Sequence, residues 1–130
     1  MSNTHRVLVV DDSDHVRILV SKLLQRRDFL HIETAANGKV GLEKVKAFRP
    51  DVIFLDAIMP EMGGLEVLQS VKKDSPGIIV VMMSSISARE EILQFKEAGA
   101  DLYLLKPFEA QKFDEALDRV LTLMKGQKEG

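Results

Sequence analysis

The sequence predicts an α/β fold in which a parallel β-sheet is covered by helices on both faces. Five short runs rich in apolar residues alternate with five longer stretches whose apolar residues recur every three or four positions. Most of these runs are continuously apolar, as is typical of strands that are buried on both sides. Strands that alternate with one-faced helices favour a parallel sheet. No internal repeat, low-complexity segment or linker interrupts the pattern, so we expect a single domain.

The first predicted strand is Arg6–Val10, and it ends at two acids, Asp11 and Asp12. A helix over Ser13–Arg27 follows, and the serine or the aspartate at its start can cap the first turn. Its apolar residues have the spacing of a single helix face: Val16, Leu19, Val20, Leu23 and Leu24.

The second predicted strand, His31–Ala35, is half polar, which indicates a position at the edge of the sheet. Asn37 and Gly38 then turn the chain into a short helix over Lys39–Phe48. This helix ends before Pro50, because the residue before a proline is disfavoured in the α-helical region.

The third predicted strand, Val52–Leu55, is fully apolar, and Asp56 stands where the strand must end. A carboxylate joined to a buried strand is costly unless water, a metal ion or a counter-charge serves it. We therefore predict that Asp56 is the reactive group of the protein. Beyond it, Gly63 and Gly64 lead into a helix that extends to Lys73.

The fourth predicted strand, Ile78–Met83, is the most apolar of the five and ends at Ser84. A helix over Ser87–Ala98 follows, and Gly99 stands where a left-handed C-terminal cap is expected. The chain thus places a hydroxyl group, in place of an acid, at the end of this strand.

The fifth predicted strand, Leu102–Leu105, ends at Lys106. The last helix is predicted over Glu109–Met124, where apolar residues again form one face. The residues after it are polar. We therefore divide the chain into one domain over residues 1–125 and a polar C-terminal tail over residues 126–130.

The composition excludes several classes of protein. With 130 residues, 45% hydrophobic and 29% charged, the chain has ordinary globular usage. It has no cysteine, which excludes disulfides and thiolate metal sites. The formal net charge is -2, and no block of Lys and Arg indicates a nucleic-acid footprint. No apolar run is long enough to span a membrane and no signal peptide is evident, so we expect a cytoplasmic protein.

Groups able to do chemistry follow four of the five strands. They are Asp11 and Asp12, Asp56, Ser84, and Lys106. The carboxyl ends of parallel strands share one edge of the sheet, and ligands bind beyond that edge. Two carboxylates about 5 Å apart repel by roughly 3 kcal/mol at an effective dielectric constant of about 20. Mg²⁺ relieves such repulsion and often bridges carboxylates to phosphate. The set therefore predicts a phosphoryl-binding site in which an aspartate can be the nucleophile.

This ordered set resembles the receiver domain of bacterial two-component response regulators, the CheY-like family. The residues that carry the resemblance are Asp11-Asp12, Asp56 followed by Met59-Pro60, Ser84, Tyr103 and Lys106-Pro107. The resemblance covers essentially the whole chain. It implies a flavodoxin-like (βα)5 fold, with a doubly wound five-stranded parallel sheet in the order 2-1-3-4-5, and a receiver domain over residues 1–125.

By this resemblance, Asp56 is the phosphoacceptor and Lys106 pairs with the phosphoryl oxygens. The implied cofactor is Mg²⁺, or Mn²⁺ in its place. Asp12 would bind the ion directly and Asp11 mostly through water. Asp56 and the backbone carbonyl of Ile58 would complete the metal shell.

The resemblance also implies two switch residues, because Ser84 would swing to hydrogen-bond the phosphoryl group and Tyr103 would turn inward behind it. The peptide bond between Lys106 and Pro107 is expected to be cis. These roles imply a phosphoacceptor switch and not a turnover enzyme.

The implied partners are proteins. A sensor histidine kinase or a histidine phosphotransfer protein would supply the phosphoryl group. A downstream protein would read the surface formed by residues 87–98, 102–105 and 109–124. A homodimer that depends on phosphorylation is a further possibility, whereas direct binding to nucleic acid or to a membrane is not implied.

Three alternatives remain beside this interpretation. The length favours a stand-alone regulator or a phosphorelay intermediate over a receiver module of a larger regulator or hybrid kinase. A haloacid-dehalogenase type phosphohydrolase would need an acid two residues after its nucleophile, where this chain has Ile58. A flavodoxin-like FMN carrier would need a phosphate-binding loop after the first strand. Three of the four residues at 11–14 are aspartates here, and they would repel phosphate.

Apolar residues also occupy two positions that flank the route of hydrolytic water in receivers. Ile58 lies two residues after Asp56, and Ile86 lies two residues after Ser84. Neither side chain can orient an attacking water molecule. We therefore expect slow loss of the phosphoryl group. Gly63 stands where receivers often have an aspartate, which should weaken the cap of the next helix by a few tenths of a kcal/mol.

Overall fold

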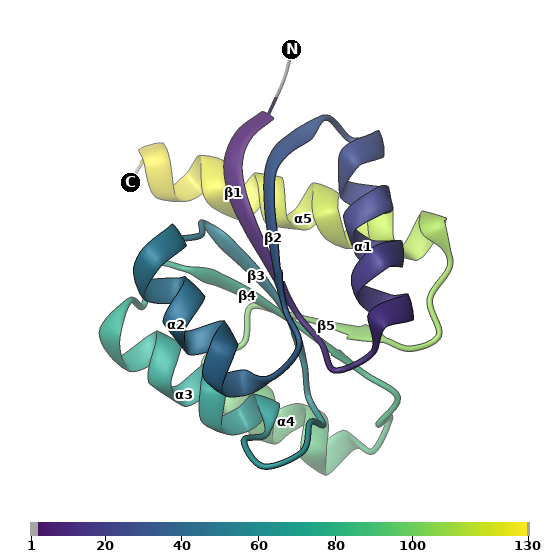
Figure 1. Ribbon diagram of the computed structural model, residues 1–130, viewed down its shortest axis with the longest axis vertical. Coiled ribbons are helices and arrows are strands. Elements are labelled where there is room, and N and C mark those ends of the chain that lie inside the picture. Colours follow the sequence, from purple (N-terminus) through teal and green to yellow (C-terminus); the bar gives the residue numbers. More distant parts are fainter. Residues whose placement is uncertain (1–2, 130) are drawn as a thin grey trace.

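Strands and helices alternate along the whole of the computed structural model, which describes the backbone of residues 3–129 (Figure 1). The strands are β1 (Asn3–Val10), β2 (Phe29–Ala35), β3 (Val52–Asp56), β4 (Ile79–Ser84) and β5 (Leu102–Leu105). The helices are α1 (Asp14–Arg26), α2 (Gly38–Phe48), α3 (Gly64–Asp74), α4 (Arg89–Glu97) and α5 (Ala110–Glu129). Each predicted element is therefore present.

The five strands form one parallel sheet in the order β2-β1-β3-β4-β5. This is the order that the resemblance implied, and β2 lies at an edge as its half-polar sequence predicted. The central strands are aligned so that Val10 pairs with Leu55, and Leu55 pairs with Met82. Consequently the strand ends that carry acids and the serine lie on one edge of the sheet.

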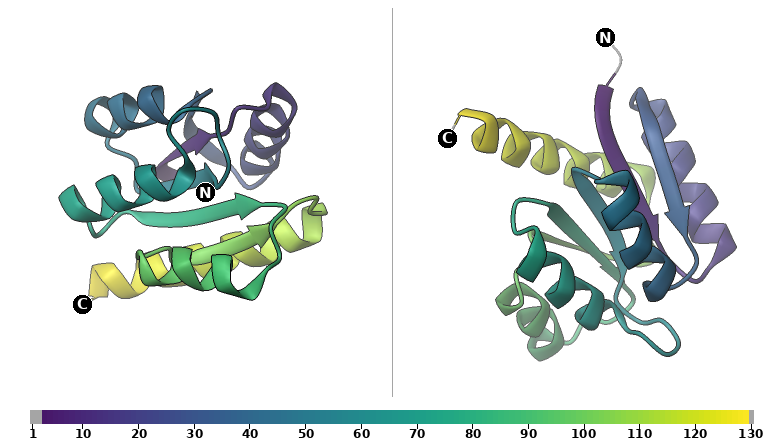
Figure 2. Two further views of the ribbon diagram at one scale, coloured as in Figure 1. Left: turned by 90° about the horizontal axis from the view of Figure 1, so that it is seen from below. Right: turned by 60° about the vertical axis from the view of Figure 1, so that its left-hand side comes forward.

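The sheet separates two hydrophobic layers, because alternate residues of a strand point to opposite faces. Val7 and Val9 belong to the layer beneath α1 and α5, whereas Leu8 and Val10 belong to the layer beneath α2, α3 and α4. Two views of the ribbon show the helices on both faces (Figure 2). Strands β3 and β4 are buried along their whole length, which explains their continuously apolar sequences.

Local sequence signals mark the start of two helices and the end of a third. The hydroxyl of Ser13 accepts a hydrogen bond from the amide of Val16, and the Asn37 side chain accepts one from Val40, so both residues cap their helices. Gly99 follows α4 with a φ of 107°, as predicted for a left-handed cap.

Some boundaries differ from the prediction. β1 begins at Asn3 and β2 at Phe29, earlier than expected. α5 continues to Glu129, so the predicted helix end at Met124 was wrong. Residues 125–129 contain Lys, Gln and Glu, which favour helices, and the single glycine among them costs only about 1 kcal/mol. The boundary between a domain and a tail at residue 125 remains a prediction.

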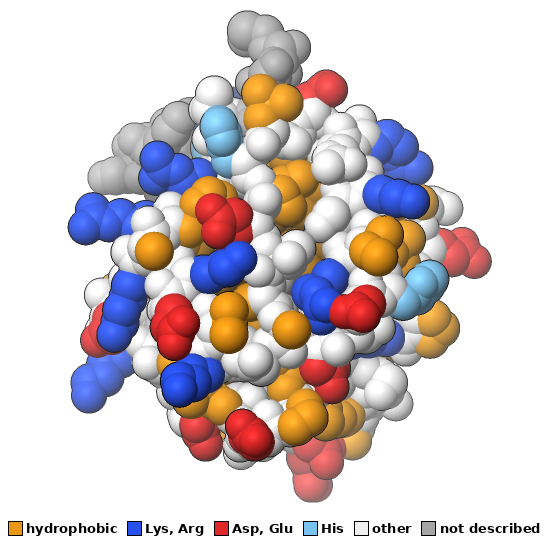
Figure 3. Space-filling view, viewed as in Figure 1, with side chains coloured by type: hydrophobic (Ala, Val, Ile, Leu, Met, Phe, Trp, Pro, Cys, Tyr) orange, Lys and Arg blue, Asp and Glu red, His pale blue; other side chains and the backbone are white. Residues whose placement is uncertain are grey.

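The surface over α2 and α3 mixes basic and acidic side chains with apolar ones (Figure 3). This mixture agrees with the small net charge of -2. Within residues 3–129, no helix has both the length and the apolar composition required to cross a membrane.

Candidate functional site

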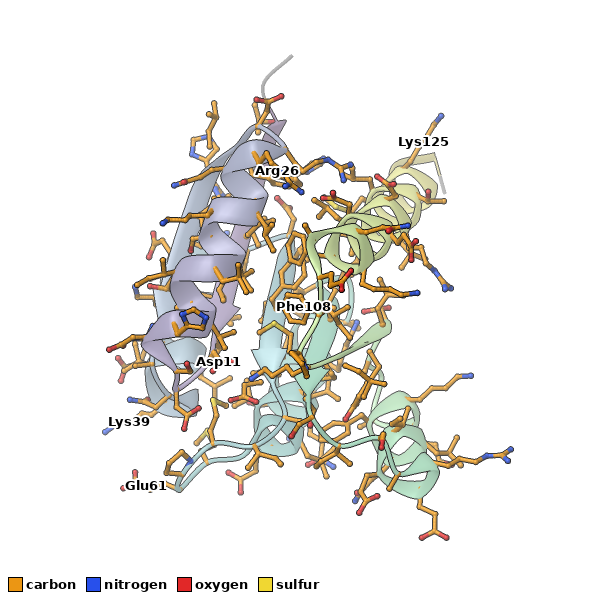
Figure 4. All side chains as sticks on the ribbon, turned by 90° about the vertical axis from the view of Figure 1, so that its right-hand side faces the viewer. Asp11, Arg26, Lys39, Glu61, Phe108 and Lys125 are labelled. Atoms are coloured by element: carbon orange, nitrogen blue, oxygen red, sulfur yellow. The ribbon has the colours of Figure 1, made fainter. Side chains whose placement is uncertain are left out.

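Three carboxylates gather at the carboxyl edge of the sheet. Asp11 and Asp12 follow β1 directly, and Asp56 is the last residue of β3. One oxygen atom from each lies within 4.8 Å of the others. Asp11 and Asp56 are buried, whereas Asp12 is exposed. Asp11 lies at the same end of the molecule as Glu61 (Figure 4). The predicted cluster of acids is thus present.

Lys106 reaches this cluster from the end of β5. Its Nζ atom lies 2.7 Å from Oδ2 of Asp11 and 3.3 Å from Oδ1 of Asp56. The peptide bond that joins Lys106 to Pro107 is cis, as expected. The backbone amide of Lys106 donates to the carbonyl of Ser84 at 2.8 Å, which fixes the base of the side chain on the neighbouring strand.

The environment of Asp56 raises its pKa from 3.8 to about 6. Burial is the largest cause and the charge of Asp11 is the next, because both disfavour the ionised form. The ammonium of Lys106 and the amide of Ile58, which donates to Oδ1 at 3.3 Å, act in the opposite direction. The pKa of Lys106 is raised: burial lowers it, but the hydrogen bond to Asp11 and the charges of Asp56 and Asp11 outweigh burial.

The donor set fits a hard divalent cation. The three carboxylates and the lysine ammonium leave two negative charges when all are ionised, and all the acidic donors are oxygen atoms. Mg²⁺ prefers oxygen ligands of this kind. The charge of Asp11 raises the pKa of Asp56 by more than the charge of Lys106 lowers it, so Lys106 alone does not offset the repulsion between the two acids. A cation at this position would do so.

Hydrogen bonds and close packing fix the backbone around Asp56. The amide of Ala57 donates to the carbonyl of Met83 at 2.9 Å, and the amide of Gly64 donates to the carbonyl of Ala57 at 3.0 Å. A Cβ atom at Gly64 would lie only 2.3 Å from the carbonyl oxygen of Asp56. Only glycine therefore allows the start of α3 to approach the acid-bearing strand this closely. Gly63, at the cap position, makes no side-chain cap bond.

The two predicted switch residues meet at the loop after β4. The Ser84 hydroxyl, which is buried, accepts a hydrogen bond from the amide of Ile86 at 3.0 Å. The hydroxyl of Tyr103 donates to the carbonyl of the same residue at 3.0 Å. The ring of Tyr103 lies 6.0 Å from that of Phe95 on α4. One peptide segment is therefore bonded from both sides, by β4 and by β5.

Comparison with known proteins shows the family. A model of the response regulator receiver domain matches residues 7–118. The chain belongs to the response regulator receiver domain family.

Relatives of this receiver domain include short and long proteins. It is 32% identical over 117 residues to the chemotaxis protein CheY of Bacillus subtilis, which covers 90% of this chain and 98% of that protein. The solved structure of CheY4 of Vibrio cholerae superposes with a TM-score of 0.85 at 35% identity, covering 91% of this chain and 99% of the other. The response regulator VraR of Staphylococcus saprophyticus is 37% identical over 113 residues, but the match covers only 54% of it.

Receiver domains of this family are signalling switches of two-component systems. They bind Mg²⁺ at an acidic pocket. Response regulators interact with histidine kinases and with downstream targets. The match favours this family over the phosphohydrolase and FMN-carrier alternatives. Because relatives of both lengths match, a stand-alone protein remains a prediction.

One residue of the receiver site was missed at the level of sequence. Nη1 of Arg17, on α1, donates to the backbone carbonyl of Asp11 at 2.7 Å. A signal for it existed: an arginine stands among apolar residues on the inner side of the first helix, one turn after Asp14. The prediction instead treated the helix only as an apolar face.

Proposed function

We propose that this receiver domain accepts a phosphoryl group on Asp56 in a Mg²⁺-dependent step. The donor would be a phosphohistidine of a sensor histidine kinase or a histidine phosphotransfer protein in the cytoplasm. The observation that carries the proposal is the placement of Asp56: its carboxylate is fixed at the end of a buried strand, within 4.8 Å of two further acids and 3.3 Å from Lys106.

In the proposed step, a carboxylate oxygen of Asp56 attacks phosphorus. A phosphorus–oxygen bond forms, the phosphorus–nitrogen bond to the donor breaks, and its electron pair stays on the imidazole nitrogen. The product is an acyl phosphate. Asp12, Asp56 and the carbonyl of Ile58 would hold the cation directly, and Asp11 mostly through water. When bound, Mg²⁺, or Mn²⁺ in its place, supplies neutralisation of the phosphoryl charge.

Lys106 and Ser84 would hold the phosphoryl group on Asp56. Lys106 already contacts an oxygen of Asp56, so it needs only a short movement to pair with the phosphoryl oxygens. Ser84 must give up its hydrogen bond from Ile86 to turn its hydroxyl toward the new group. The loop after β4 would then keep its bond with Tyr103, so the loop and the tyrosine could move together as the ring turns inward. A single charged group thus biases a two-state element.

We further propose that the altered surface is that of α4, β5 and α5. Each of these elements exposes one large apolar side chain: Leu93 is 48% exposed, Leu105 is 44% exposed and Leu123 is 40% exposed. We propose that these three side chains contribute to one protein-binding surface. The partner is a downstream protein, and a second copy of the phosphorylated chain is a further candidate. The formal net charge of -2 gives no support for nucleic acid as the direct partner.

Acetyl phosphate with Mg²⁺ tests the central assignment. We expect the wild type to gain one phosphoryl group by intact-mass spectrometry, and Asp56→Asn to gain none. Asp74→Asn, at an exposed position at the end of α3, is the matched control and should react like the wild type. Chelation with EDTA should abolish the reaction, and Mn²⁺ should restore it. An equal adduct on wild type and Asp56→Asn would show that the acceptor lies elsewhere.

A further inference from the structure

Arg17 joins α1 to the turn that carries two of the three acids. Its Nη1 atom donates to the carbonyl of Asp11 at 2.7 Å, and its Nη2 atom pairs with the carboxylate of Asp14. The Arg17 side chain is 17% exposed, so most of it is covered by protein. We propose that Arg17 is a positioning residue, which holds the turn after β1 in the geometry that Mg²⁺ binding by Asp11 and Asp12 requires. This inference rests on the proposed function.

The carbonyl of Asp11 needs such a donor. The amide of Asp11 still bonds to the sheet, at 3.1 Å from the carbonyl of Ala35, but its own carbonyl lies past the last residue of β1. Within the described part of the chain, Arg17 is the donor to this carbonyl. Because Asp11 is fully buried, water cannot easily replace the arginine.

The Asp11 side chain is held at both of its oxygen atoms. The amide of Ser13 donates to Oδ1 at 2.9 Å, and Lys106 lies 2.7 Å from Oδ2. Asp12 is exposed and its side chain interacts with that of Asp56, so the backbone of the turn and the neighbouring acid both set the position of its carboxylate. Asp12 is the acid that would bind the cation directly. By holding the carbonyl of Asp11, Arg17 therefore helps to position Asp12.

The planar guanidinium explains why an arginine stands here. It presents several N–H groups in a fixed arrangement, so it can donate to the carbonyl of Asp11 and to Asp14 together. A lysine ammonium is a point charge on a flexible stem and cannot reproduce both contacts in one geometry. Asp14 belongs to the first helical turn of α1. Through its two contacts the arginine therefore joins the loop after β1 to the start of this helix.

Charge and positioning predict opposite effects of removing Arg17. Its positive charge lies close to the acids, so its loss alone would strengthen the binding of a cation. Loss of the contact to Asp11 would instead allow the turn to move and would weaken binding. Partners that orient metal ligands typically affect affinity by 10- to 100-fold. The sign of the change therefore distinguishes the two roles.

The experiment is calorimetric titration of the full chain with MgCl₂. We expect Arg17→Gln and Arg17→Lys each to bind Mg²⁺ about 10-fold more weakly than the wild type. Arg27→Gln is the control, because Arg27 also lies at α1 and its ion pairs with Asp114 and Asp118 are remote from the acids. It should lower the thermal stability in EDTA and leave the affinity for Mg²⁺ unchanged.

Three results would overturn the inference. Tighter Mg²⁺ binding by Arg17→Gln would show that the arginine acts only through its charge, and equal binding would show that it does not position the acids. An equal loss of affinity in Arg27→Gln would show that any destabilisation of α1 has the same effect. No binding by the wild type would reject the proposed function together with this inference, whereas the first two results would reject the inference alone. If Arg17→Gln does not fold, Arg17→Lys, which keeps the charge, provides the decision.

Discussion

Asp56 carries a charge that the folded protein, without a cation, holds at a cost. The carboxyl group has a pKa of about 6 in the folded chain, against 3.8 without the fold, chiefly because it is buried and next to Asp11. Between these two values the folded state binds the proton more tightly than the unfolded state does. The free energy of unfolding therefore falls as the pH rises through this window, and the loss persists above it.

This residue makes a prediction about pH. Removing the charge with Asp56→Asn should stabilise the metal-free protein at about pH 8 by up to about 3 kcal/mol, and the gain should shrink toward zero near pH 4. Urea unfolding in EDTA at both pH values measures it. Asp74→Asn, exposed at the end of α3, serves as the control. Its effect on the free energy of unfolding should be similar at the two pH values. If both variants shifted stability alike, Asp56 would not be the group responsible.

Ile58 makes a prediction about the lifetime of the phosphorylated form. Its side chain is 57% exposed beside the acids and offers no polar atom to orient water. We expect the wild-type phosphoryl group to persist for much longer than seconds. Ile58→Asn should lose it about 10-fold faster, a smaller acceleration than a fully positioned general base supplies. Phos-tag gels of the decay measure both. Leu30→Asn, at another exposed apolar residue, should leave the rate unchanged, and a wild-type lifetime of seconds would refute the expectation.

At the scale of elements, the start of α3 and the end of β3 act as one unit, because Gly64 permits their contact. Gly64→Ala would put a Cβ atom 2.3 Å from the carbonyl oxygen of Asp56 and 2.7 Å from Cα of Ala57. Neither backbone atom can move without shifting the site. We expect a loss of about 2 kcal/mol or more in urea unfolding, together with weaker phosphorylation. Gly77→Ala meets no atom within 4 Å and should be nearly neutral, so similar losses for both would contradict the steric argument.

The elements themselves were largely predictable from sequence. Continuously apolar runs gave β3 and β4, and the half-polar run gave the edge strand β2. Helix starts followed from local caps such as Ser13 and Asn37. The end of α5 was missed because the helix formers after Met124 are polar and have no apolar pattern, and the glycine among them does not end the helix. The strand order came from the resemblance, since periodicity does not determine which strands are neighbours.

The site was predictable as a set of groups but not as a network. Strand ends located the acids, Ser84 and Lys106, because a parallel sheet brings those ends together. The sequence does not state which partner each group takes. Lys106 bridges Asp11 and Asp56, and Ser84 bonds to its own loop at Ile86. These choices depend on side-chain distances of a few ångströms, which the pattern of apolar residues does not encode.

At the scale of the whole molecule, stability is distributed unevenly. α3 has four buried residues and begins beside the strand that carries Asp56, whereas Phe95 is the buried residue of α4 among those described. Neither helix has a side-chain cap bond at its start, so the difference between them lies in the buried residues. The helix at the proposed output surface is therefore the less firmly attached of the two.

This unevenness makes a prediction about local opening. Amide hydrogens of α4 should exchange with deuterium faster than those of α3 in the unphosphorylated protein, because α4 buries fewer side chains. Exchange followed by NMR at single residues measures this. Beryllofluoride with Mg²⁺, a stable mimic of the phosphoryl group, should change protection in α4 and leave α3 nearly as it was. Slower exchange in α4 than in α3 would contradict the picture of a loosely held switch helix.

The direction of the strands has a practical consequence for measurement. β1 begins, and α5 ends, at the end of the molecule opposite to the acids (Figure 1). A fluorescent protein or a surface-immobilisation tag joined at either terminus would extend away from Asp56, Lys106 and the loop after β4. Two such tags would leave the phosphoryl donor a clear approach. The chain is therefore suited to sensors that report the phosphorylated state without obstructing the reaction they record.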